Sequence, residues 1–188
     1  MGNAVIISED KVIDAVKQAI AEALEIDKST IGSDSSLIRD LGAESLDFLD
    51  INYRLEQTFG IKMARHTILE HVEEMFGEES AIDANGKLTK KAVDLLEMRF
   101  DGAEIGLAPG IDVEEAPSII TVRSMARGVM DVLASVPDKC PACGNPSWTA
   151  EDGAHIKCGS CGEQAVFTNG DDLMKAWLEK VQEEKKLF

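Results

Sequence analysis

One stretch of the chain, SSLIRDLGAESLDFLDI (residues 35–51), passes from a polar loop into an amphipathic helix and determines the fold of this region. The loop ends near Gly42, and Ser45 follows where the helix begins. A serine at this place either caps the helix, by accepting a hydrogen bond from a backbone N–H, or serves as an attachment point for another group. An apolar stripe and several acidic residues follow Ser45, and we expect it to have both roles.

Apolar residues recur at intervals of three and four on both sides of this stretch, the pattern of amphipathic helices. The first helix is expected over residues 9–24 and the second over residues 45–59, where Gly60 supplies a C-cap. Ile31 and Leu37 interrupt the polar loop between the two helices and are expected to pin it to the core. The fold class predicted from these patterns is mainly α.

A short motif within the opening stretch, LGAESLD (residues 41–47), resembles the attachment motif of acyl carrier proteins, which is usually written LGxDSLD. Other segments are similar to the same family. LIRDL (residues 37–41) resembles its loop, LEQTFGI (residues 55–61) resembles the end of its second helix, and Thr121-Val122 opens a helix as the family's last helix opens. The resemblance covers residues 5–61 and resumes at about 119–136.

This resemblance implies an acyl-carrier-type helical bundle in which Ser45 bears a covalent 4'-phosphopantetheine arm. The positive end of the helix dipole suits the added phosphate. A carrier of this kind holds acyl intermediates as thioesters for a dedicated fatty acid, lipid or polyketide-type pathway, and it is not an enzyme. The implied partners are a phosphopantetheinyl transferase and acyl-processing enzymes such as synthases, ligases and reductases.

The second helix also carries acidic residues that are expected to form its exposed face. Such a face would dock on basic patches of the partner enzymes, where charge complementarity adds specificity and speeds association. Two departures from the family pattern affect this surface, because Glu44 stands where the motif usually has Asp and Arg54 adds a positive charge. The expected docking residues are Glu44, Asp47, Asp50 and Glu56.

Residues 62–118 form an insertion relative to this family. The pattern predicts a helix that ends at Gly77, a turn at Asn85-Gly86, a second helix capped by Thr89, and a long loop over residues 101–118. The insertion would widen the acyl pocket, act as a lid or offer a private docking surface, or it is a structural ornament on the bundle.

Two histidines, His66 and His71, lie in this insertion. They are five residues apart, and this spacing does not place two side chains on one face of a helix. The sequence therefore predicts no metal site shared by the two residues.

The four cysteines form two C-x-x-C pairs separated by 14 residues. In a chain without an evident export signal, this clustering favours a metal site over disulfides. Four thiolates at this spacing suit a closed, structural zinc site, and iron in a rubredoxin-like site is the alternative. His155 lies between the pairs, but four cysteines make it redundant as a ligand. The expected ligands are Cys140, Cys143, Cys158 and Cys161.

The cysteine segment resembles a zinc ribbon over residues 137–168, with short strands expected at 154–157 and 165–167. A C-terminal amphipathic helix follows from residue 171. The expected domains are therefore a helical bundle over residues 1–136, including the insertion, and a zinc ribbon with its buttressing C-terminal helix over residues 137–188.

Composition restricts the partners and the location. The chain has 35 acidic and 19 basic residues, and the net charge of -16 repels phosphate backbones, so we expect no binding to nucleic acid. No run approaches the roughly 20 apolar residues needed to span a bilayer, and no signal peptide is evident. We expect a cytoplasmic monomer. The alternative function is that of a zinc-ribbon interaction or regulatory protein that retains a carrier-like bundle.

Overall fold

The computed structural model describes residues 6–100 and 106–188, and it is mainly helical, as the sequence predicts. None of its helices combines the length and the apolar character needed to cross a membrane. The chain divides into two compact units. The first comprises Met1–Met63 and Thr121–Gly170, and the second comprises Ala64–Ile120 and Asp171–Phe188.

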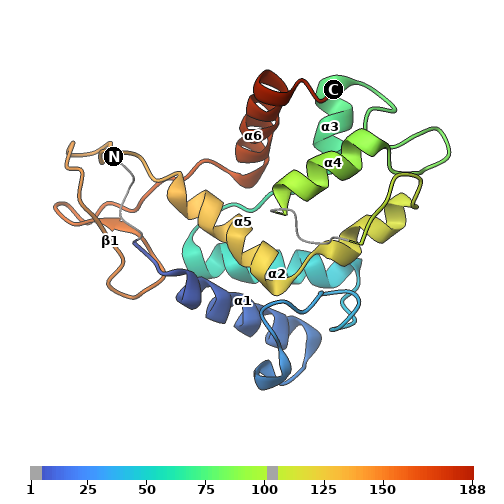
Figure 1. The fold of residues 1–188 in the computed structure, drawn as a ribbon. Helices are drawn as coiled ribbons and strands as arrows, with labels where there is room; N and C mark the ends of the chain where they lie inside the picture. The colour runs from blue at the N-terminus through green and yellow to red at the C-terminus, as the bar shows by residue number, and fades with distance from the viewer. Residues whose placement is uncertain (1–5, 101–105) are drawn as a thin grey trace. The chain divides into compact units, whose positions relative to one another are not determined.

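The first unit contains a bundle of three helices, α1 (Glu9–Leu24), α2 (Ser45–Phe59) and α5 (Val122–Ala134). Helix α1 packs against both α2 and α5 (Figure 1). The predicted bounds of the first two helices are confirmed. Gly60 ends α2 with φ of 67°, a left-handed conformation that glycine adopts without the penalty of a Cβ atom. The buried side chains of this bundle include Val12, Val16, Ile20, Ile51, Leu55, Phe59 and Val129.

The loop between α1 and α2 contains a short 3-10 helix, η1 (Lys28–Thr30), and is held to the bundle along its length. Ile31 and Leu37 are buried, which confirms that they pin the loop to the core. The backbone N–H of Val122 donates to the carbonyl of Ser35 at 3.1 Å, so the loop is also tied to the start of α5. The loop that leads into α2 is therefore held in one position on the bundle.

Glu56 is buried in α2, so its predicted place on an exposed docking face is wrong. The chain beyond Gly60 folds back over this side chain. The Glu56 carboxylate accepts a hydrogen bond from the backbone N–H of Met63 at 3.0 Å and pairs with Lys62 Nζ at 3.4 Å. A buried carboxylate with these partners ties the residues after Gly60 to α2 and is not exposed for contact with another protein.

Replacing Glu56 with alanine is expected to lower the free energy of unfolding by about 1–3 kcal/mol, because the partly buried N–H of Met63 loses its acceptor. Urea denaturation of the full chain measures this loss. Gln57→Ala is the matched control, since Gln57 is exposed and lies next to Glu56 in the same helix. Equal stability of the two variants would contradict the structural role given to Glu56.

The second unit is built from the insertion and the end of the chain. It contains α3 (Ile68–Phe76), α4 (Lys90–Arg99), the 3-10 helix η2 (Val113–Ile119) and α6 (Gly170–Lys185). The predicted helix before Gly77 and the helix cap at Thr89 are confirmed, since Thr89 Oγ1 accepts from the backbone N–H of Ala92.

The long loop predicted over residues 101–118 is only partly correct. Residues 101–105 lie outside the described residues, and residues 113–119 form η2, which contains Pro117. Asp112 caps η2 by accepting from the backbone N–H of Glu114, so this segment has more regular structure than its glycine and proline content suggests.

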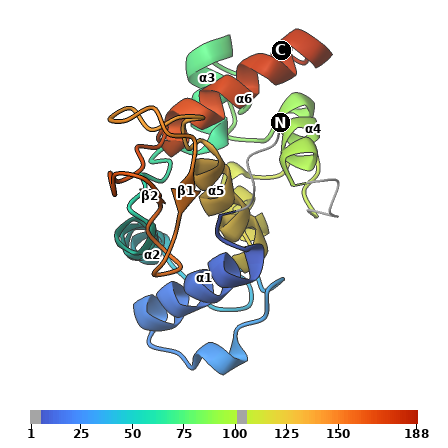
Figure 2. The ribbon, with the colours of Figure 1, turned by 90° about the vertical axis from the view of Figure 1, so that its left-hand side faces the viewer.

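The C-terminal helix α6 belongs with the insertion, although it was predicted to buttress the cysteine segment. Leu178 and Val181 of α6 are buried in one core with residues of α3 and α4, and Figure 2 shows α6 running past α3. Trp177 and Met174 pack against the same core, which also includes Leu69, Val72, Leu88, Ala92, Val93, Leu95 and Leu96. The insertion therefore has a hydrophobic core of its own, completed by a helix from the far end of the chain.

Candidate functional site

The serine predicted as an attachment point lies at the start of α2 and is exposed. The loop before it turns at Gly42, whose φ of 73° lies in the left-handed region that favours glycine. Ala43 is buried next to it and donates its backbone N–H to the carbonyl of Leu37 at 2.8 Å. The loop thus fixes the direction in which α2 begins and leaves Ser45 accessible from solvent.

Ser45 is not the helix cap, so that part of its predicted role is wrong. Glu44 is the N-cap residue and Ser45 is the first residue of the helix. The carboxylate of Asp47 reaches back and accepts from the backbone N–H of Glu44 at 2.7 Å, as in a capping box. The Ser45 hydroxyl forms no hydrogen bond with any residue that the structure describes. The hydroxyl is consequently available for chemistry instead of being used in folding.

The remaining residues of the predicted docking face are near the helix start but differ in their partners. Glu44 is exposed, whereas Asp47 and Asp50 are half-buried. Asp50 pairs with Arg54 at 2.9 Å, and Arg54 also pairs with Glu22 of α1. Arg54 therefore neutralises part of the acidic charge of this helix, and the acidic charge closest to Ser45 is that of Glu44 and Asp47.

An exposed apolar stripe on α2 was not predicted from the sequence. Leu46 is 77% exposed, Leu49 55% and Tyr53 57%. Their spacing of three and four places them on one face of the helix, beginning next to Ser45. The signal is present in the sequence, because this stripe lies on the opposite side of the helix from buried Ile51 and Leu55. Contiguous exposed apolar side chains indicate a surface for binding another molecule.

The four cysteines converge, with their sulfur atoms all within 4.8 Å of one another. Cys140 Sγ lies 3.7 Å from Cys161 Sγ, and Cys143 Sγ lies 3.6 Å from Cys158 Sγ. Four sulfurs bonded to one zinc at about 2.3 Å would be separated by about 3.8 Å, so this cluster has the dimensions of a tetrahedral site. Backbone N–H groups of Cys161 and Ser160 lower the pKa of Cys158 to about 6. Despite the backbone N–H of Glu163, the neighbouring Cys143 sulfur and burial raise the pKa of Cys161 to about 12, so Cys158 is the first of the two to become a thiolate.

The strands around the cysteines are shorter than predicted and partly misplaced. Strand β1 (Trp148–Thr149) pairs antiparallel with β2 (Lys157–Cys158), and residues 165–167 form no strand. His155 does not join the cluster, because its Nδ1 lies 2.8 Å from Asp152 Oδ2. Trp148 Nε1 donates to the carbonyl of Pro137 at 2.7 Å, which ties β1 to the start of this segment.

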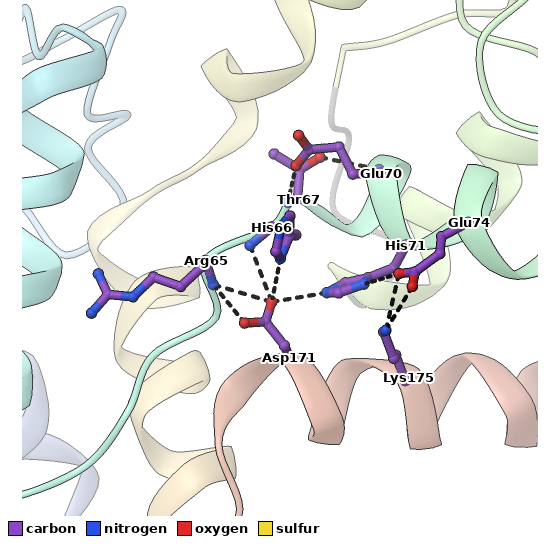
Figure 3. A network of polar contacts seen from close by, with 8 residues as sticks. All are labelled: Arg65, His66, Thr67, Glu70, His71, Glu74, Asp171 and Lys175. Carbon is purple, nitrogen blue, oxygen red and sulfur yellow. Dashed lines mark hydrogen bonds and ion pairs between the residues drawn. The ribbon is translucent and has the colours of Figure 1, made fainter.

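His66 and His71 lie together in the second unit, which was not expected from their spacing. His66 precedes α3, so the spacing of residues along a helix does not apply to this pair. Both imidazoles face Asp171 at the start of α6, as Figure 3 shows. Asp171 accepts from the backbone N–H groups of Arg65 and His66 at 3.0–3.1 Å. Burial opposes ionisation of Asp171, but these bonds and His71 outweigh it and lower the pKa of the carboxyl.

Comparison with known proteins agrees with the arrangement around Ser45. The family described as "Phosphopantetheine attachment site" matches residues 14–73. The acyl carrier protein AcpXL of Rhizobium etli is 46% identical over 61 residues, which are 32% of this chain and 66% of that protein. The acyl carrier proteins of Thermotoga maritima and Treponema denticola are 39% and 44% identical over 56 and 54 residues. These segments are 30% and 29% of this chain and 69% of each relative.

The chain therefore belongs to the acyl carrier protein family. The aligned part spans slightly less than two thirds of the AcpXL relative. No solved structure matches the chain.

Proposed function

We propose that Ser45 carries a 4'-phosphopantetheine group and that the protein carries acyl groups for a dedicated fatty acid, lipid or polyketide-type pathway. The observation that carries this proposal is an exposed serine hydroxyl, free of hydrogen bonds to the described residues, at the first position of α2. The group attached there supplies a terminal thiol that holds an acyl chain as a thioester.

The residues around Ser45 suit this attachment. The first turn of a helix presents unsatisfied N–H groups and the positive end of the helix dipole, both of which favour a phosphodiester. Gly42 has no side chain, and a Cβ atom built there meets nothing within 4 Å, so the approach to the loop is open. A modifying enzyme can therefore reach Ser45 without displacing side chains of the loop.

The surface next to Ser45 supports partner binding. Leu46 and Leu49 offer apolar area, and Glu44 and Asp47 offer negative charge beside it. Such a surface fits enzymes that combine a basic rim with an apolar pocket, where the charges guide association and the apolar contacts supply affinity. The partners in this proposal are a phosphopantetheinyl transferase and acyl-processing synthases, ligases and reductases. The protein itself presents the acyl group and does not catalyse its chemistry.

The cysteine cluster completes the proposal as a structural zinc site held by Cys140, Cys143, Cys158 and Cys161. The sulfur separations of 3.6 and 3.7 Å support it, and four thiolates leave no open position for catalysis. Its role is to fold the segment between α5 and α6. A red, iron-loaded protein would contradict zinc as the native ion.

Attachment to Ser45 is tested by incubating the full chain with coenzyme A and a broad-specificity phosphopantetheinyl transferase. We expect the intact mass to rise by one phosphopantetheine per chain, because one accessible serine begins α2. Digestion and tandem mass spectrometry are expected to locate the added group on the peptide that contains Ser45. An unchanged mass with several transferases would contradict the carrier function and favour the interaction or regulatory alternative. The cytoplasmic location and the monomeric state stay predictions.

A further inference from the structure

We propose that His66, His71 and Asp171 form a binding site for a divalent transition metal, and that zinc is the ion that suits these ligands best. One ligand atom from each residue lies within 4.8 Å of the other two. Two imidazoles and one carboxylate form a known donor set for zinc, with water in the fourth position. The site lies in the second unit and the cysteine cluster lies in the first, so this inference does not rest on the proposed carrier function.

The distances between the ligand atoms fit a single ion. Asp171 Oδ1 lies 3.0 Å from His71 Nε2 and 3.5 Å from His66 Nδ1. Ligand atoms bound tetrahedrally to zinc at about 2.0–2.1 Å lie about 3.3–3.4 Å apart, and the two observed distances lie on either side of this value. The two rings meet edge to face, with centroids 5.6 Å apart, and both direct a nitrogen toward Asp171 (Figure 3). Small side-chain adjustments would therefore complete the coordination.

The second nitrogen of His71 gives independent support. His71 is 1% exposed, and its Nδ1 is buried without a hydrogen-bond partner. The nearest carboxylate is that of Glu74, whose Oε2 lies 3.7 Å away. If Nε2 of a neutral ring donates its hydrogen to Asp171, Nδ1 is left as a bare acceptor that faces another acceptor. This is an unfavourable arrangement for a buried polar atom.

A metal on Nε2 resolves this conflict. It forces the hydrogen of the neutral ring onto Nδ1, which then faces Glu74, and a carboxylate beyond a metal-bound histidine is a common second partner in zinc sites. Lys175 holds Glu74 in place, with its Nζ 2.9 Å from Oε2. A doubly protonated ring would meet the same two carboxylates, so a proton and a metal compete for Nε2.

The remaining two ligands differ in exposure in a way that suits metal entry. The side chain of His66 is 63% exposed and that of Asp171 is 22% exposed, whereas His71 anchors the site from the interior. The backbone N–H groups of Arg65 and His66 orient the Asp171 carboxylate, which keeps it ionised and aimed between the rings. Water can reach the exposed side and complete the coordination.

Metal binding would fasten the start of α6 to the segment before α3. His71 and Asp171 are 100 residues apart in the sequence, so the ligands come together only in the folded unit. An ion that binds the folded unit and not the unfolded chain raises the thermal stability of that unit. The predicted role of the site is therefore to hold the C-terminal helix in the core of the second unit.

The test is a zinc titration of the full chain. The protein is first loaded with one equivalent of zinc, which the four thiolates take up, and further zinc is then added in a calorimeter. We expect a second equivalent to bind. The nitrogen NMR resonances of the His66 and His71 rings should shift with it, with the hydrogen of His71 on Nδ1, while those of His155 stay unchanged. These readouts do not depend on any activity of the protein.

Three variants decide the assignment. His66→Ala removes an exposed ligand, and Asp171→Asn keeps an oxygen that accepts from the backbone N–H groups of Arg65 and His66. Both should weaken the second equivalent by more than about tenfold, because even altering the partner of a zinc ligand costs about 10–100-fold. His155→Ala, which removes another histidine paired with an aspartate, should bind like the unaltered protein. Ring resonances of His66 and His71 that do not shift at any zinc concentration, or unchanged affinity in both ligand variants, would overturn the proposal, whereas saturation at one equivalent with shifted rings would instead contradict zinc at the cysteines.

Discussion

Replacing Ser45 with alanine is expected to abolish the attachment of phosphopantetheine completely, with no added mass after any time of incubation with coenzyme A and transferase. The reason is chemical, since alanine has no hydroxyl to form the phosphodiester. A loss of attachment can be assigned to the missing hydroxyl because the substitution does not disturb the fold. Ser45 is exposed and its hydroxyl is bonded to none of the described residues, so the substitution leaves the fold intact. Surface substitutions of this kind change the free energy of unfolding by about 0.5 kcal/mol or less.

The matched control is Ser29→Ala, because Ser29 is also exposed and lies in the first unit. We expect this variant to gain one phosphopantetheine at the rate of the unaltered protein. Circular dichroism and urea denaturation of both variants check that they fold alike. A Ser45→Ala protein that still gains the full mass would contradict the assignment of the attachment site, whatever the family of the chain.

Removing the metal from the cysteine cluster is expected to unfold residues 137–168 and to leave α1, α2 and α5 helical. The segment has a two-residue strand pair and few buried apolar side chains, so a metal bound by the four cysteines would supply most of its folding energy. Structural zinc in small modules contributes apparent binding energies of about 10–16 kcal/mol at neutral pH, which is more than this segment can replace. The bundle has its own core, in which Val16, Ile51 and Leu55 are fully buried.

Hydrogen exchange read peptide by peptide measures this effect before and after chelation, with metal analysis to confirm that the ion is gone. We expect protection to disappear around the two cysteine pairs and to persist in the three helices. Adding zinc back should restore protection, whereas a Cys140→Ser and Cys158→Ser double variant should stay unprotected throughout. Protection of residues 137–168 that survives complete removal of the metal would contradict the structural role. Loss of protection in α1, α2 and α5 would show that the first unit is one cooperative block.

Local sequence patterns were sufficient for most of the helical architecture. The bounds of α1 and α2, the cap at Thr89 and the left-handed Gly60 follow from interactions between residues that are at most a few positions apart. Apolar periodicity and capping are properties of single segments, so a sequence displays them directly. The cysteine cluster belongs to the same class, because two short motifs at a suitable spacing already restrict its geometry.

Errors arose where the chain returns to cover a side chain, or where neighbouring polar groups compete for the same backbone N–H. Glu56 occupies the outward-facing pattern of an acidic helix, yet the backbone of Met63 folds over it and makes it a buried acceptor. Ser45 was predicted to be the N-cap of α2. The N-cap is instead Glu44, one residue earlier, whose backbone N–H donates to the carboxylate of Asp47. Both outcomes are competitions between nearby polar groups, and a pattern of residue types does not decide which group wins.

The sequence by itself determined that this chain is helical, that Ser45 begins a helix within a motif that resembles the attachment motif of acyl carrier proteins, and that four cysteines have the spacing to share one ion. Only the tertiary structure decided that α6 completes the core of the insertion and that Asp171 lies between His66 and His71. The physical reason is the length of chain between the partners. The contact between Asp171 and the histidines forms because Leu178 and Val181 of the same helix are buried in the core of the insertion. The sequence near either partner does not show which distant segment will complete that core.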